Sequence, residues 1–77
     1  MFEKIRGIML DYVDVDPGSI TLETRFLADL NMNSLDIMDM VGRMEDEFDV
    51  TIETEDLNTI FTVGELIDYL AGLGVTE

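Results

Sequence analysis

Ser34 is the residue with the clearest chemical potential in this chain, because it stands where a helix is predicted to begin. Asn33 before it is a good N-cap, and Asp36 completes a pattern close to a capping box. The chain has no His, and no Lys lies near Ser34, so no general base activates its hydroxyl. Beyond the structural role that serines often have in a first turn, any chemistry here needs another enzyme. A helix N-terminus would favour an anionic group attached there.

The rest of the composition excludes most other site chemistry. Cys and His are both absent, which removes thiolate nucleophiles, Ser-His-Asp triads, disulfides and most transition-metal sites. Asp14, Asp16 and Gly18 resemble the start of a calcium-binding EF-hand loop. Ser19 would then replace the glycine of that loop and Arg25 its final glutamate, so the pattern fails. We predict no catalytic residue and no metal site, and the chain is not expected to be an enzyme.

Acidic side chains dominate the charge. The 77 residues contain 18 Asp+Glu against 4 Lys+Arg, a formal net charge of −14 at pH 7, yet 47% of them are hydrophobic, unlike a disordered acidic tail. The basic residues are too few and scattered for nucleic-acid binding. No apolar run approaches the roughly 20 residues that span a bilayer, and Glu3 in the first turn argues against a signal peptide. We therefore expect a soluble, cytoplasmic, monomeric protein with basic partners.

Apolar residues recur at helical spacing in three segments. The first, 2–13, predicts an amphipathic helix of about three turns. The second begins at Ser34 and finishes near Phe48. The last opens with a capping-box pattern, Thr62-Val63-Gly64-Glu65, and is terminated by Gly72 and Gly74.

The connections between these segments complete the predicted fold. Residues 14–33 form a long loop, in which Ile20, Leu22, Phe26, Leu27 and Leu30 could anchor the chain across the core and residues 28–30 could form a short turn. A weak helix is predicted over 55–59 with Thr54 as its cap, and 50–52 is extended loop. The prediction is an all-α fold: a small four-helix bundle of three main helices and one short helix, a single domain over 1–77.

The second helix has two kinds of apolar residue. With about 100° per residue and Ile37 at zero, a core stripe within about 60° is made of Met40, Val41, Met44 and Phe48. Leu35, Met38 and Gly42 lie off it, at roughly 100–160°, beside acidic residues. They could form a wide core stripe in which methionine fills gaps. Alternatively, they form an apolar contact patch rimmed by carboxylates, for a partner with a hydrophobic depression surrounded by Arg and Lys.

Three motifs resemble those of acyl carrier proteins. The run DLNMNSLD (29–36) resembles the prosthetic-group motif of that family, usually written D-L-G-x-D-S-L-D. The run EDEFD (45–49) is similar to the family's E-E-E-F-D at the end of the same helix, and FTV (61–63) with IDYL (67–70) resembles the opening of its last helix. The order and spacing agree over essentially the whole chain, so the sequence resembles an acyl carrier protein of the free-standing bacterial type.

This resemblance implies a function. Ser34 would carry 4'-phosphopantetheine, transferred from coenzyme A by a phosphopantetheinyl transferase, and the thiol of that arm would hold acyl groups as thioesters for fatty-acid synthesis enzymes. The family's four-helix bundle would hold the acyl chain between helices, and its acidic second helix would dock on basic patches of the synthases. The resemblance assigns docking to Asp29, Leu35, Asp36, Met38, Asp39, Glu45 and Asp46.

Several positions depart from the family pattern. Asn33 replaces the usual Asp before the serine and brings no charge, Asn31 replaces the usual Gly, and Gly42 stands where a bulkier apolar residue is common. After the second helix, Ile52-Glu53 stands where the family usually has Ile-Pro. A specialised carrier of polyketide or aminoacyl (non-ribosomal peptide) intermediates shares the attachment chemistry and remains an alternative. A small acidic interaction module without a prosthetic group is the third hypothesis.

Overall fold

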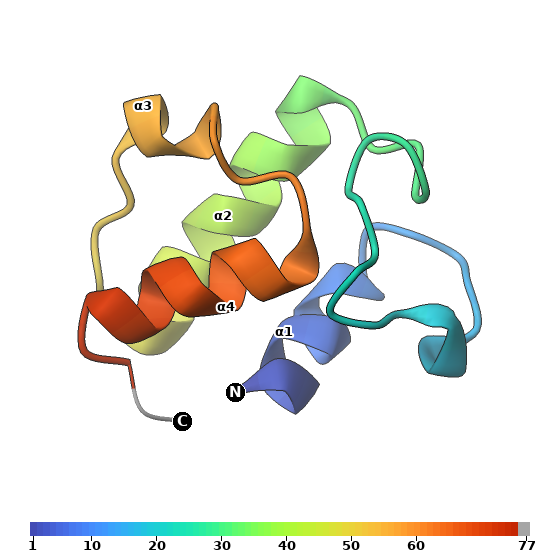
Figure 1. Ribbon diagram of the computed structural model, residues 1–77, viewed down its shortest axis with the longest axis horizontal. Helices are drawn as coiled ribbons and strands as arrows, with labels where there is room; N and C mark the ends of the chain where they lie inside the picture. The colour runs from blue at the N-terminus through green and yellow to red at the C-terminus, as the bar shows by residue number, and fades with distance from the viewer. Residues whose placement is uncertain (76–77) are drawn as a thin grey trace.

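The computed structural model describes residues 1–75, and their elements are all helical (Figure 1). Within this range the single pairing of extended backbone is an isolated antiparallel bridge between Arg25 and Thr62. The predicted all-α class, with three main helices and one short one, is confirmed. The elements in chain order are α1 (Phe2–Met9), a 3-10 turn η1 (Pro17–Ser19), α2 (Ser34–Phe48), α3 (Thr54–Leu57) and α4 (Val63–Gly72).

Both predicted capping boxes are present. Asn33 Oδ1 accepts a hydrogen bond from Asp36 N at 2.8 Å, while Asn33 N donates to Asp36 Oδ2 at 3.5 Å, which fixes the first turn of α2. Thr62 Oγ1 accepts from Glu65 N at 3.2 Å, and Thr62 N donates to Glu65 Oε1 at 3.0 Å, which does the same for α4. Each box satisfies backbone donors that a helix N-terminus leaves without intrahelical partners.

Three predicted helix boundaries are wrong. The helix α1 ends at Met9, about one turn earlier than predicted, and the chain continues in a tighter turn in which Tyr12 N donates to Met9 O at 2.9 Å. Such bonds satisfy the last carbonyls of a helix, and this turn still directs Tyr12 and Val13 toward the core, which is why the periodicity extends past the helix. In α3, Thr54 is the first helical residue and not the cap, and the helix ends at Leu57 and not at residue 59. The N-cap is Glu53, which makes no side-chain capping bond.

The core lies between the three main helices. Its fully buried side chains come from α1, α2 and α4: Ile5, Met9, Met40, Met44, Val63, Leu66 and Leu70. Burial of a side chain of this size stabilises the fold by roughly 1.5–3 kcal/mol relative to leaving it exposed. From the long loop, Ile20 and Phe26 are buried as expected. Leu22 and Leu27 are instead about half exposed, at 49% and 53%, so these two anchors were wrongly predicted.

The second half of the long loop is bonded to the start of α4. Gly64 N donates to Leu22 O at 2.8 Å, and Phe26 N donates to Phe61 O at 3.1 Å. A Cβ on Gly64 would lie 3.1 Å from Leu22 O, which is tighter than an ordinary contact, so glycine suits this close approach. These bonds fix the loop that leads into α2 and place residues 25–28 beside residues 60–61. No helix within residues 1–75 is long and apolar enough to cross a membrane.

Candidate functional site

Ser34 is the first residue of α2, and its side chain is exposed. The turn before it is closed by Asn31, whose φ of 55° lies in the left-handed region. Glycine adopts this conformation most readily and asparagine tolerates it better than most residues, which explains how Asn31 fills a position that is usually glycine in the motif. The capping box of Asn33 and Asp36 then orients the first turn, so a group attached to Ser34 would meet the positive end of the helix dipole.

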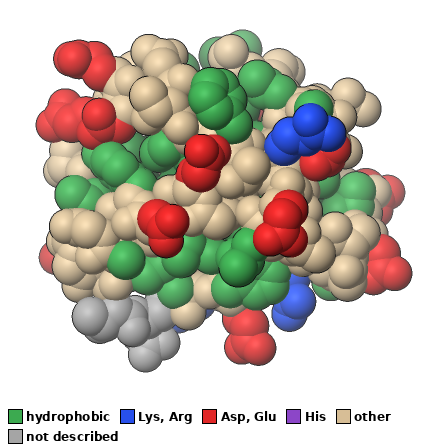
Figure 2. All heavy atoms as spheres, in the orientation of Figure 1, with side chains coloured by type: hydrophobic (Ala, Val, Ile, Leu, Met, Phe, Trp, Pro, Cys, Tyr) green, Lys and Arg blue, Asp and Glu red, His purple; other side chains and the backbone are tan. Residues whose placement is uncertain are grey.

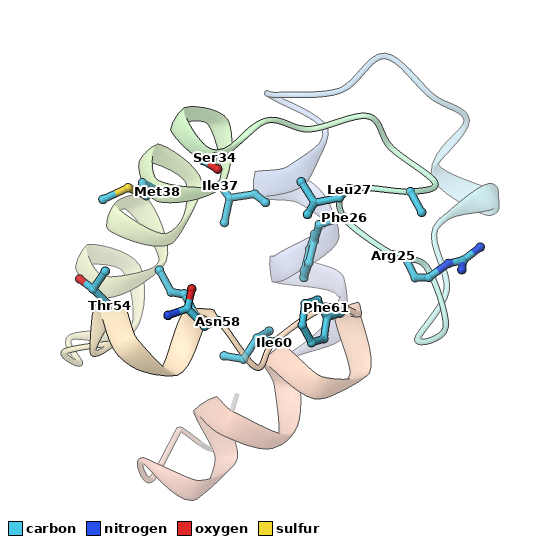
Figure 3. A pocket seen from close by; sticks show the side chains of 12 residues that line it. Arg25, Phe26, Leu27, Ser34, Ile37, Met38, Thr54, Asn58, Ile60 and Phe61 are labelled. Carbon is cyan, nitrogen blue, oxygen red and sulfur yellow. The ribbon is translucent and has the colours of Figure 1, made fainter.

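A pocket of about 490 Å³ opens beside Ser34 (Figure 3). In the close-up, Phe26, Ile37, Ile60 and Phe61 point into the space that separates α2 from α3 and from the start of α4. The polar side chains of Thr54, in α3, and of Asn58, directly after α3, also border the pocket. The complete lining consists of Arg25, Phe26, Leu27, Ala28, Ser34, Ile37, Met38, Thr54, Leu57, Asn58, Ile60 and Phe61. The pocket is therefore mainly apolar and has the candidate attachment serine at its edge.

The sequence alone does not reveal this pocket. In the sequence, Phe26 and Leu27 are expected to anchor the loop, and Phe61 belongs only to a motif. A signal was present, because Ile60 and Phe61 are bulky apolar residues outside any helical stripe, and Phe61 is 54% exposed. Assembling the pocket, however, requires the pairing of residues 25–28 with 60–61, which is a long-range contact that periodicity does not contain.

Asp29 lies in the turn before α2 and is held by Arg25. Its Oδ2 accepts from Arg25 N at 2.8 Å, and its Oδ1 lies 3.2 Å from Arg25 Nη2. The backbone hydrogen bond, followed by the side-chain bond from the guanidinium, holds the pKa of Asp29 below its ordinary value. Of the seven predicted docking residues, Asp29 is thus the one that lies outside α2, and its carboxylate has an intramolecular partner.

The four acidic docking candidates on α2 have different surroundings. Asp36 is part of the capping box, and Glu45 Oε2 accepts from Ile52 N at 2.6 Å, so both carboxylates hold local structure. Asp39 Oδ2 accepts from the Tyr12 hydroxyl at 3.0 Å. Asp46 is exposed, and its side chain has no hydrogen bond or ion pair within residues 1–75. Of the four, Asp39 and Asp46 therefore leave the most carboxylate surface accessible on this helix.

The exposure of Leu35 and Met38 decides between the two interpretations of the apolar residues outside the core stripe. Leu35 is 79% exposed and Met38 is 53% exposed, whereas Met40 and Met44 on the core stripe are 1% and 0% exposed. A wide core stripe is therefore wrong. Leu35 and Met38 form an exposed apolar patch at the start of α2, beside Ser34 and the edge of the pocket.

Each of the four basic side chains is engaged within the molecule. Lys4 Nζ lies 3.4 Å from Glu47 Oε2, Arg43 Nη1 lies 2.6 Å from Asp11 Oδ2, and Arg25 pairs with Asp29. The guanidinium of Arg6 lies 5.5 Å from the centre of the Phe2 ring. On the face drawn in Figure 2, acidic side chains stand among apolar surface and basic ones are few. The uncompensated charge of the surface is negative.

Comparison with known proteins identifies the family. Residues 3–70 match the family described as the phosphopantetheine attachment site. A curated acyl carrier protein from Picosynechococcus sp. is 39% identical over 71 residues, which cover 92% of this chain and 88% of the relative. A structure from Mycobacterium tuberculosis, provisionally assigned as an acyl carrier protein, superposes with a TM-score of 0.82 at 30% identity, over 91% of this chain and 93% of that one. The chain therefore belongs to the acyl carrier proteins, which carry phosphopantetheine and are substrates of other enzymes, not enzymes themselves.

Proposed function

We propose that this protein carries acyl intermediates of fatty-acid synthesis as thioesters on a 4'-phosphopantetheine arm attached to Ser34. The observation that supports the proposal best is the position of Ser34: an exposed hydroxyl, in the first turn of α2, at the edge of a largely apolar pocket. The phosphodiester that forms on this hydroxyl would be stabilised by the free N–H groups and the dipole of α2.

The pocket supplies a place for the acyl chain. An acyl chain exposed to water would gain roughly 0.8 kcal/mol for each methylene group that it buries. Ile37, Phe26 and Ile60 offer apolar surface at the pocket's centre, and Ser34 at its edge would let an arm attached there fold back and insert its acyl end. The protein thereby shields the chain between visits to successive enzymes.

Docking on those enzymes would use the outer face of α2. Leu35 and Met38 provide an apolar centre, with the exposed carboxylates of Asp39 beside it and of Asp46 about two turns further along the helix. We assign the partners to a phosphopantetheinyl transferase and to synthase enzymes with basic patches, because such patches complement this surface and accelerate encounter. The high net negative charge also opposes self-association, so we propose a monomer. We further propose that it acts in the cytoplasm, where coenzyme A is available to the transferase.

Intact-mass spectrometry after incubation with coenzyme A and a bacterial phosphopantetheinyl transferase tests the attachment. The chain contains two serines, and Ser19 offers a matched control because its hydroxyl donates to Asp16 O at 2.7 Å in the 3-10 turn. Wild type and Ser19→Ala are expected to gain one phosphopantetheine, and Ser34→Ala none. Equal modification of Ser34→Ala, or none of wild type, would contradict the proposal.

A second candidate function, a carrier of polyketide intermediates, is favoured by two polar residues of the pocket. Thr54 borders it from α3, and Asn58, the C-cap residue of α3, borders it directly after that helix (Figure 3). A chain that retains keto or hydroxyl oxygens could accept hydrogen bonds from these groups, and a saturated chain has no acceptor to offer them. Loading with octanoyl and with 3,5-dioxooctanoyl groups separates the two, because a 3-oxo group alone also arises in fatty-acid synthesis. A larger rise in Tm for the oxo chain, lost in Asn58→Leu, would favour the polyketide carrier.

A further inference from the structure

We propose that Phe61 and Leu27 form an apolar lip that closes over the acyl chain where it enters the pocket, and that this lip determines which acyl groups the protein retains. The lip is defined as these two side chains, one from the segment before α4 and one from the long loop. The inference rests on the proposed function, because the chain that the lip covers is the one carried on the arm attached to Ser34.

The lining of the pocket divides into a floor and an exposed edge. Its floor is made of apolar side chains that belong to the core or pack against it: Phe26, Ile37, Leu57 and Ile60. Leu27 and Phe61 also line the pocket, but they are 53% and 54% exposed and belong to neither group. The fold therefore leaves the apolar surface of the lip uncovered, at the edge of the pocket.

The lip lies across the opening of the pocket from Met38. In the view of Figure 3, Leu27 and Phe61 lie on one side of the space, and Met38 lies on the other, on α2. Met38 is 53% exposed, so exposed apolar side chains border the opening on both sides. An arm attached to Ser34 remains outside the pocket while its acyl chain is inside, so the thioester that joins them would lie at this opening.

The backbone under the lip is held by hydrogen bonds. Phe61 N donates to Glu65 Oε1 at 2.8 Å, and Phe61 O accepts from Phe26 N at 3.1 Å. On the other side of the lip, Leu27 O accepts from Asn31 N at 3.2 Å. Because the backbone is fixed, the Phe61 ring moves only about its two side-chain torsions, and ordering it over a bound chain costs little entropy.

The charge beside the lip does not oppose an apolar chain. Among the described residues that line the pocket, Arg25 alone is charged. Its Nη2 lies 3.2 Å from Asp29 Oδ1, and its side chain points away from the pocket in Figure 3. A hydrocarbon chain can therefore contact the lip without removing water from an unpaired charge.

Retention by the lip should depend on the acyl group. The free energy gained on burial grows with the apolar area that is covered, so an octanoyl chain is held in the pocket and an acetyl group is not. With an octanoyl chain inserted, Phe61 and Leu27 would cover the opening and keep small nucleophiles from the thioester. The rate at which such a nucleophile cleaves the thioester therefore reports on the lip.

The experiment measures how fast hydroxylamine cleaves the thioester of protein loaded from acetyl- or octanoyl-coenzyme A by a phosphopantetheinyl transferase, with loading and cleavage followed by intact mass. We expect wild type to lose octanoyl about tenfold more slowly than acetyl. Phe61→Ala should lose octanoyl about fivefold faster than wild type, and Leu27→Ala about threefold faster. Phe61→Leu should keep most of the protection, because its side chain is still apolar. Acetyl cleavage should stay within about twofold of wild type in all three variants.

Leu22→Ala is the matched control. Leu22 lies in the same loop as Leu27 and is 49% exposed, but it is not among the described residues that line the pocket. Its truncation should leave octanoyl cleavage at the wild-type rate. The Tm of each unloaded variant is measured as well, and we expect it to stay close to that of wild type, because Phe61, Leu27 and Leu22 are each about half exposed.

The outcomes separate the lip from the proposed function. If wild type acquires no arm, the proposed function fails and the lip fails with it. If octanoyl-loaded wild type and Phe61→Ala are equally protected, the lip is wrong while carriage on Ser34 stands. The lip is also wrong if Phe61→Ala accelerates acetyl and octanoyl cleavage equally, or if its unloaded Tm falls well below that of Leu22→Ala. Equal cleavage of the two acyl groups in wild type would contradict both the lip and shielding by the pocket, and would leave the attachment to Ser34 unaffected.

Discussion

The hydroxyl of Tyr69 donates a hydrogen bond of 2.6 Å to Asp56 Oδ2, which ties α4 to the four-residue helix α3. This bond, more than the partial burial of the ring, raises the pKa of Tyr69 above its ordinary value. Since α3 has no side-chain cap and contributes Thr54 and Leu57 to the pocket, the bond restrains one wall of the space assigned to the acyl chain.

Tyr69→Phe should loosen that wall with little effect on the rest of the fold. A hydrogen bond of this kind contributes about 1 kcal/mol, so global stability should fall slightly, while amide hydrogen exchange in residues 54–58 should accelerate. Tyr12→Phe is the control, because it removes a tyrosine hydrogen bond to Asp39 on α2 instead. Equal exchange at α3 in the two variants would show that Tyr69 does not hold the wall.

Met38 and Met40 have the same side chain, but Met38 lies on the proposed docking surface and Met40 lies in the core. Met38→Ala should slow the transferase reaction and leave Tm almost unchanged, since Met38 is 53% exposed. Met40→Ala should destabilise the fold by about 2–5 kcal/mol, since Met40 is 1% exposed in the core and its truncation leaves a cavity. Thermal unfolding and transferase rates measure both. A loss of several kcal/mol in Met38→Ala would place that residue in the core and remove it from the docking surface.

Charge reversal at Asp46 tests electrostatic docking. Asp46→Lys should lower kcat/KM for the transferase, and the difference from wild type should shrink as salt is raised from low to physiological concentration. Asp68→Lys changes the net charge equally but lies exposed on α4, away from Ser34, so its effect should be smaller. Rates that do not depend on salt, or equal losses in the two variants, would argue against steering by α2.

The pH dependence of stability should contain a contribution from Glu65. Its Oε1 accepts from Phe61 N at 2.8 Å and Thr62 N at 3.0 Å, and these bonds hold the pKa of Glu65 below its ordinary 4.5. The stabilisation is therefore fully present above pH 4.5 and is lost as pH falls through the lowered folded-state pKa. Urea unfolding of wild type and Glu65→Gln should differ most near pH 7 and converge under acid. A difference that stays constant down to pH 3 would show that the charge of Glu65 does not matter.

The local features of this protein could be predicted from its sequence. Asn33 with Asp36, and Thr62 with Glu65, specify helix starts through bonds between residues three positions apart, and the predicted bounds of α2 agree with the structure. Helical geometry determines which face of a helix a residue occupies, and it places Leu35 and Met38 outside the core stripe. An exposed patch was one of the two interpretations of this position, and both residues are exposed in the structure.

The features that depend on distant contacts could not be predicted. The pocket needs Phe26 and Phe61 side by side, which follows from the bonding of the long loop to the start of α4. The same pairing leaves Leu27 at the surface, although its apolar character suggested an anchor. The early end of α1 likewise reflects a turn whose side chains still pack on the core, so periodicity did not distinguish that turn from continued helix.

The mass of the protein isolated from its native host tests the attachment to Ser34 most directly. Tryptic cleavage after Arg25 and Arg43 releases a peptide spanning 26–43, which contains Ser34, and cleavage after Arg6 and Arg25 places Ser19 in a separate peptide. We expect the 26–43 peptide to carry one phosphopantetheine, with or without an acyl group, and the Ser19 peptide to be unmodified. An unmodified 26–43 peptide, or the arm on any other peptide, would contradict Ser34 as the site from which this protein presents its acyl chains.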